Sequence, residues 1–306
     1  MAISTNYAFS VAVKQMQDVQ AKITKTQSQL ATGDMTGNPS DNPDATASIQ
    51  RLQTAITRQA SYGKSLTQAD SRLATQETSI SGASDALIRI KELSIQASND
   101  TLSPQDRSNI SIEIRSLRDQ LLSLANARDE SGNYVFGGAR TGSQPFAADA
   151  SGRISYAGDQ SQVSIAIGEQ RQIAVGGVGS QIFSTLVRSV DGEPVGVSFF
   201  QSLDDLSRAV KAGDTATIQR GLGEVDTMQE GISSGIARIG SARNSIDEQK
   251  TIVDATNLRL QTTLSGIKDT DYIVAATDLQ KQMLALQAAQ STFAQTAKMS
   301  LFDYIK

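Results

Sequence analysis

The sequence predicts a mainly α-helical fold with a small β insert at mid-chain, and three observations support this prediction. Apolar residues recur every seven positions in two long stretches of the 306-residue chain. Residues 44–103 and 195–306 are free of the strongest helix breaker, since the prolines stand only at 39, 43, 104, 145 and 194. Aromatic residues are absent from 63–133 and 201–271, whereas seven lie between 134 and 200.

The first proline-free stretch is expected to form one long helix or a closely joined pair of helices. A new helix is predicted to begin near Pro104, because Ser103 and Asp106 have the spacing of a capping box, and to end before Gly132. From the seven-residue series of the first stretch we assign four residues to the core of a helical rod: Leu66, Leu73, Ile80 and Leu87.

The second proline-free stretch predicts a single rod over 215–266, about 75 Å long at 1.5 Å per residue. The adjacent acids Asp204 and Asp205 are expected in the first turn of a preceding helix rather than as an acid–base pair. The rod core here is assigned to Ile232, Ile239, Ile246 and Val253, the middle of a series seven apart: Ile218, Val225, Ile232, Ile239, Ile246, Val253, Leu260 and Ile267.

The insert between these stretches predicts a β-hairpin. Val163, Ile165 and Ile167 alternate with polar residues, and Ile173 and Val175 alternate again after a turn. The aromatic residues of the insert are interpreted as the core of this small domain rather than as a ligand site.

The two ends predict matching amphipathic helices whose apolar residues follow steps of three and four. About five large apolar side chains on such a helix contribute roughly 7–15 kcal/mol. Ordering about 30 residues costs on the order of 30–60 kcal/mol, so each helix should order only when other surfaces cover it. Their assembly seam is assigned to Phe9, Met16, Val19, Ile23, Leu30, Leu279, Met283, Leu286 and Phe293; the second series also contains Ala276 and Gln290.

Together these elements predict three domains: terminal helices (1–32 and 273–306), a helical rod (33–132 and 203–272) and a β-rich outer domain (133–202). With no cysteine, histidine or tryptophan, the chain lacks the residues of disulfides, Cys/His zinc sites and Ser-His-Asp triads. We therefore expect no enzyme activity, no cofactor and no metal. The net charge of −4 without basic runs argues against nucleic acid, and short apolar stretches argue against a membrane partner.

Three segments, in their order along the chain, resemble the flagellin superfamily. The loop from Gly33 to Asp44 follows the first helix, and the segment from Asp269 to Lys306 matches the C-terminal helix and short apolar tail of the family. The segment Gly132-Asn133-Tyr134-Val135-Phe136-Gly137-Gly138, with Thr141 and Gln144-Pro145-Phe146 after it, resembles the hook–filament junction branch more than filament-forming flagellins.

This resemblance implies an extracellular flagellar subunit, exported by the flagellar type III apparatus without a cleaved signal peptide. Its termini would polymerise with other copies between hook-associated protein 1 (FlgK) and flagellin, and an export chaperone would first shield the C-terminal helix. A short flagellin is the alternative within the family. A monomeric helical scaffold with a β binding module is the alternative from another class.

Overall fold

The computed structural model describes residues 2–37, 42–99, 101–150, 152–190 and 193–304. Its contacts divide the chain into two compact units, Met1–Ala60 with Ala255–Lys306 and Ser61–Asp254. Both boundaries fall inside a helix, so two long helices belong in part to each unit. The three-domain division expected from the sequence stays a prediction.

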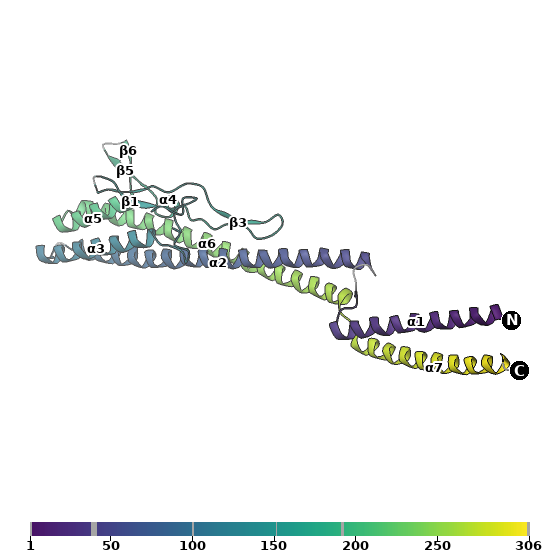
Figure 1. Ribbon diagram of the computed structural model, residues 1–306. Helices are drawn as coiled ribbons and strands as arrows, with labels where there is room; N and C mark the ends of the chain where they lie inside the picture. The colour runs from purple at the N-terminus through teal and green to yellow at the C-terminus, as the bar shows by residue number, and fades with distance from the viewer. Residues whose placement is uncertain (1, 38–41, 100, 151, 191–192, 305–306) are drawn as a thin grey trace. The chain divides into compact units, whose positions relative to one another are not determined.

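Seven helices are found in the described ranges, and the two long ones are continuous. The stretch after Pro43 forms one helix rather than a pair, and the rod expected over 215–266 is confirmed as one helix. In Figure 1 the helices are α1 (Ala2–Thr32), α2 (Pro43–Ala97), α3 (Pro104–Ala125), α4 (Gly179–Ile182), α5 (Phe199–Ala212), α6 (Thr215–Lys268) and α7 (Tyr272–Tyr304).

Both ends of α3 agree with the prediction, since the helix begins at Pro104 and ends before Gly132. Ser103 caps the helix by accepting the backbone N–H of Asp106 at 3.1 Å. The last helical residue is Ala125, and the side-chain amide of the next residue, Asn126, makes two hydrogen bonds of 3.0 Å with the backbone of Phe146. Gly132 instead lies in a separate turn with φ +81°.

The core of the larger unit is built on the seven-residue series of α2 and α6. Beyond this core the burial declines, since Leu260 and Ile267 near the end of α6 are only half-buried. Arg243 of α6 binds Asp70 at 2.9 Å and Glu77 at 2.5 Å on α2, which ties the helices along this stripe. All eight residues that the sequence assigns to the rod core are buried: Leu66, Leu73, Ile80, Leu87, Ile232, Ile239, Ile246 and Val253.

The described residues of the insert form three antiparallel strand pairs, of which the sequence predicted one. The predicted hairpin is confirmed, with Ile165 opposite Ile173. The other two pairs lack a clear alternation of apolar and polar residues. The paired strands are β1 (Phe146–Ala148) with β2 (Ile154–Tyr156), β3 (Ser164–Ala166) with β4 (Gln172–Ala174), and β5 (Leu186–Val190) with β6 (Glu193–Val197).

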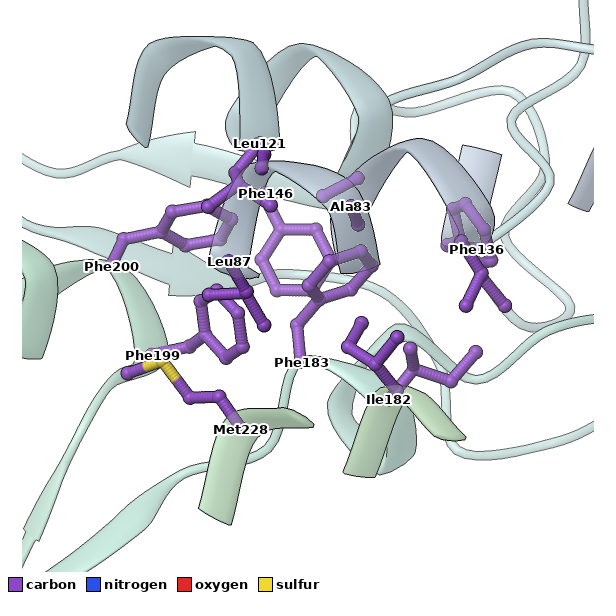
Figure 2. Packing of buried hydrophobic residues seen from close by; sticks show 14 of the residues in the cluster. Ala83, Leu87, Leu121, Phe136, Phe146, Ile182, Phe183, Phe199, Phe200 and Met228 are labelled. Carbon is purple, nitrogen blue, oxygen red and sulfur yellow. The ribbon is translucent and has the colours of Figure 1, made fainter. Parts of the chain in front are cut away.

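The aromatic residues of the insert do not form a core of their own, contrary to the prediction. Phe183 is central, with its ring 5.3 Å from Phe199 and 5.5 Å from Phe146. In Figure 2 this cluster packs with Leu87 of α2 and Met228 of α6, within one continuous buried core. Two-stranded sheets bury too little surface to stand alone, so the insert shares the core of the helices.

The glycines of the 132–138 segment have a packing role. Gly138 has φ +63°, and a Cβ there would lie 2.1 Å from the carbonyl oxygen of Asp159. Its N–H donates to the carbonyl of Gly177 at 3.1 Å, while the preceding Val135 and Phe136 are fully buried. A side chain at this position would separate two backbone segments of the insert, which explains the glycine.

The acids of α5 lie later in the helix than predicted. Ser198 caps α5 by accepting the N–H of Gln201 at 3.2 Å, so the helix begins at Phe199. Asp204 and Asp205 consequently lie in the second turn, where they pair with arginines instead of with the helix dipole.

Arg188 on β5 anchors the β5–β6 hairpin to α5 and α6. Its guanidinium donates to Glu224 at 2.5 and 2.7 Å and to Asp205 at 2.5 Å. Burial alone would raise the pKa of Glu224, but the hydrogen bonds from Arg188 and Ser202 outweigh burial and lower it. The pKa of Asp205 is lowered in the same way. Burial would raise it, but the hydrogen bonds from Arg188 and Gln201 outweigh burial.

The Arg188 cluster predicts a pH-dependent stability. The folded pKa values lie below the unfolded ones, so this stabilisation is present above about pH 4.5 and is lost as pH falls through the folded values. Arg188→Met should lower the free energy of unfolding by about 2–4 kcal/mol at pH 7 and by less at pH 3, in urea titrations of the whole chain.

Lys91→Met is the matched control, because the Lys91–Asp226 pair is exposed, with side chains 44% and 53% accessible. It should change stability by less than about 1 kcal/mol at either pH. An equal loss for Arg188→Met at both pH values would contradict the role given to the cluster.

Candidate assembly interface

In the smaller unit, α1 and α7 pair antiparallel along their lengths (Figure 1). The ring of Phe9 meets that of Phe293 edge to face, with centroids 5.3 Å apart. Further along the pair, Thr26 donates to the Gln282 side chain at 3.3 Å. Side chains from the two ends of the sequence are therefore in contact at more than one point along the helix pair.

The seam residues predicted on α1 all face this contact, but they are incompletely covered. Ile23 is buried, at 5% exposed. The other four are half-buried: Phe9, Met16, Val19 and Leu30. A second helix alone thus leaves much of the apolar stripe of α1 accessible.

On α7 the structure separates the predicted seam into two faces. Leu279, Leu286 and Phe293 are half-buried toward α1, but their companions are Ala275, Gln282 and Ala289. The predicted companions Ala276 and Gln290 are exposed, as is Met283, which is 47% accessible. Both groups of companions are spaced three and four residues from Leu279, Leu286 and Phe293. Periodicity therefore could not tell which group faces α1.

Part of the surface of the pair away from its contact carries no charge. Of the residues of α7 from Gln282 to Ala297, none is charged. Large apolar side chains stand out on it, at these exposed fractions: Tyr7 72%, Tyr272 57%, Ile273 81%, Val274 55% and Leu284 68%. Exposed large apolar side chains on a helix pair are typical of a surface that binds other protein.

The residues that the structure describes show neither a metal site nor a membrane-spanning helix. Among them no group of three or more acidic side chains is placed to hold a metal ion. None of the described helices has the length and apolarity needed to cross a membrane. Residues 38–41 of the predicted loop motif and 305–306 of the tail lie outside the described residues.

The two helical ends of the chain match known family models. The model of the bacterial flagellin N-terminal helical region matches residues 3–141, and that of the C-terminal helical region matches residues 222–305. With the paired termini and the helical rod, these matches show that the chain belongs to the flagellin family, which makes it a structural protein rather than an enzyme.

Within that family, the chain is similar over its whole length to a hook-associated protein. Flagellar hook-associated protein 3 of Escherichia coli K12 is 27% identical over 320 aligned residues, which cover all of both chains. The fold is shared with FlgL of Xanthomonas campestris (TM-score 0.62, 22% identity, 71% of this chain and 99% of that one). It is also shared with the flagellar junction protein FlgL of Legionella pneumophila (TM-score 0.57, 18% identity, 65% and 99%).

The two faces of α7 lead to a paired prediction. Leu286→Asp puts a charge into the contact with α1, whereas Leu284→Asp puts one on a face where the side chain is 68% exposed. Leu286→Asp should destabilise the helix pair by about 1–3 kcal/mol, which is a roughly 5- to 150-fold faster amide exchange in residues 9–32. Exchange in residues 61–254 should not change.

Leu284→Asp is the control for helix propensity and charge, and its effect on exchange in residues 9–32 should be less than about threefold. Equal effects of the two variants would show that α1 does not pack on the predicted face of α7.

Proposed function

We propose that this chain is a structural subunit of the bacterial flagellum at the hook–filament junction. It polymerises through its terminal helices and joins hook-associated protein 1 (FlgK) to flagellin. The observation that carries this proposal is the end-to-end similarity to a hook-associated protein 3, combined with a terminal helix pair whose apolar surface is incompletely covered.

The helix pair supplies the physical basis for assembly. Because α1 and α7 cover each other only in part, neighbouring subunits gain free energy by covering the remaining apolar surface, at about 25 cal/mol per Å². In the proposed arrangement the terminal helices form the inner layer, the rod surrounds them and the insert lies outermost. The partners are other copies of the chain in a ring, FlgK on one side and flagellin on the other.

Export is the second part of the proposal. The chain passes unfolded through the flagellar type III apparatus without a cleaved signal peptide, while a chaperone shields its C-terminal helix. The absence of cysteine, hence of any disulfide, suits a chain that must be threaded through a channel. The exposed apolar face of α7 is the surface such a chaperone would cover.

A short flagellin is the second candidate, and the flagellin family models favour it as much as they favour a junction subunit. The two candidates differ in what remains when the protein is lost. A junction subunit is needed for flagellin to polymerise on the hook, whereas a sole flagellin is itself the filament.

Deleting the gene should therefore leave hooks in place and release unpolymerised flagellin into the medium. Electron microscopy of the cells and immunoblots of the medium measure this, with the wild-type gene on a plasmid as the control that restores filaments. Hooks without any filament protein in the medium would support the flagellin instead.

A further inference from the structure

The chain segments at the base of the α1–α7 pair are bound to each other. Asp34, just after α1, lies opposite Asp269, just before α7, in an isolated antiparallel bridge. Met35 donates its N–H to the carbonyl of Lys268 at 2.7 Å, and Thr270 donates to the carbonyl of Gly33 at 2.9 Å. We call residues 33–35 and 268–270 the basal bridge.

Local interactions hold each half of the basal bridge in place. Gly33 has φ +71°, and a Cβ there would lie 2.8 Å from the Tyr272 hydroxyl. The Gln29 side chain donates to the carbonyl of Met35 at 2.7 Å, so the end of α1 holds the first half. Ser265 donates to Asp269 at 2.5 Å, so the end of α6 holds the second.

The bridge stands at the points where both terminal helices join the rest of the chain. α1 ends at Thr32, immediately before the first half, and α7 begins at Tyr272, two residues after the second. The end of α1 and the start of α7 thus both lie within two residues of the basal bridge, which holds them together. The same two hydrogen bonds join the segment that leaves α1 to the segment that leads into α7.

We propose that the basal bridge makes α1 and α7 order as one cooperative element rather than as two independent tails. Each helix alone is marginal, because its apolar stripe is narrow and half-exposed. Fixing their bases side by side turns pairing into a local event with a short loop to close, so the first contacts next to the bridge promote those further along. Loss of the bridge releases both helices together.

A disulfide tests this directly, because the chain has no cysteine of its own. Asp34 and Asp269 form a pair flanked by hydrogen bonds rather than joined by them, and such pairs have Cα atoms about 4.5 Å apart. That distance lies in the range that a disulfide spans. The variant is Asp34→Cys with Asp269→Cys in the full-length chain, and each single cysteine variant is a control.

On oxidation the double variant should form an intrachain disulfide. Amide exchange should then slow by about tenfold or more in residues 9–32 and in residues 272–295 together, and return to the reduced rate with reductant. Failure of the disulfide to form, slowing in only one helix, or no change in either would overturn the proposal. The measurement uses purified protein, so it fails or succeeds independently of the flagellar role.

A second pair of variants opens the bridge instead of locking it. In Gly33→Ala the new Cβ is disfavoured by the positive φ and collides with the Tyr272 hydroxyl. The variant should therefore speed amide exchange in both helices by about threefold or more. Gly63→Ala, at a helical glycine with open space around it, is the matched control and should leave them unchanged. Faster exchange in α1 alone, or in neither helix, would count against the coupling.

Discussion

The burial of one apolar stripe of α2 together with one of α6 is the interaction on which the larger unit depends. Leu87 and Ile232, from the two series, are inaccessible to solvent. Gly235 of α6 lies against this contact, since a Cβ there would be 3.6 Å from the Cδ1 of Ile80, an ordinary van der Waals distance. The strand pairs, too small to fold alone, add their aromatic rings to this same core, as Phe183 does. The rod is therefore the scaffold, and the insert is a layer upon it.

The terminal helices α1 and α7 have the same seven-residue apolar repeat, but their apolar stripes are less completely buried. In the larger unit α3, α5 and the insert provide further layers over the stripes, whereas α1 and α7 pack mainly on each other. Leu286 on the contact is consequently half-buried, and Leu284 on the opposite side is largely exposed. A pair that is stabilised at its base but leaves apolar surface accessible is suited to completing its core with neighbouring copies. This difference in coverage links the fold to the proposed role in assembly.

Periodicity predicted the long helices, the residues of the rod core and one hairpin, because each depends on neighbours along the chain. It could not choose between Gln282 and Met283 as companions of the α7 stripe, since the choice depends on how α1 approaches. It also missed the contact of Asn126 with Phe146 beside the end of α3, and the partners of Arg188. Those contacts join residues far apart in the sequence, and no local pattern carries them. The exposed faces of α7 were likewise visible only once the pair was seen in three dimensions.

The position proposed for this chain is the junction between hook and filament. Gold-labelled antibodies against the insert, residues 134–200, would locate it on intact flagella by electron microscopy. We predict label at a single position where the hook meets the filament, and none along the filament. Label distributed along the filament would contradict a junction position and identify the chain as a filament subunit.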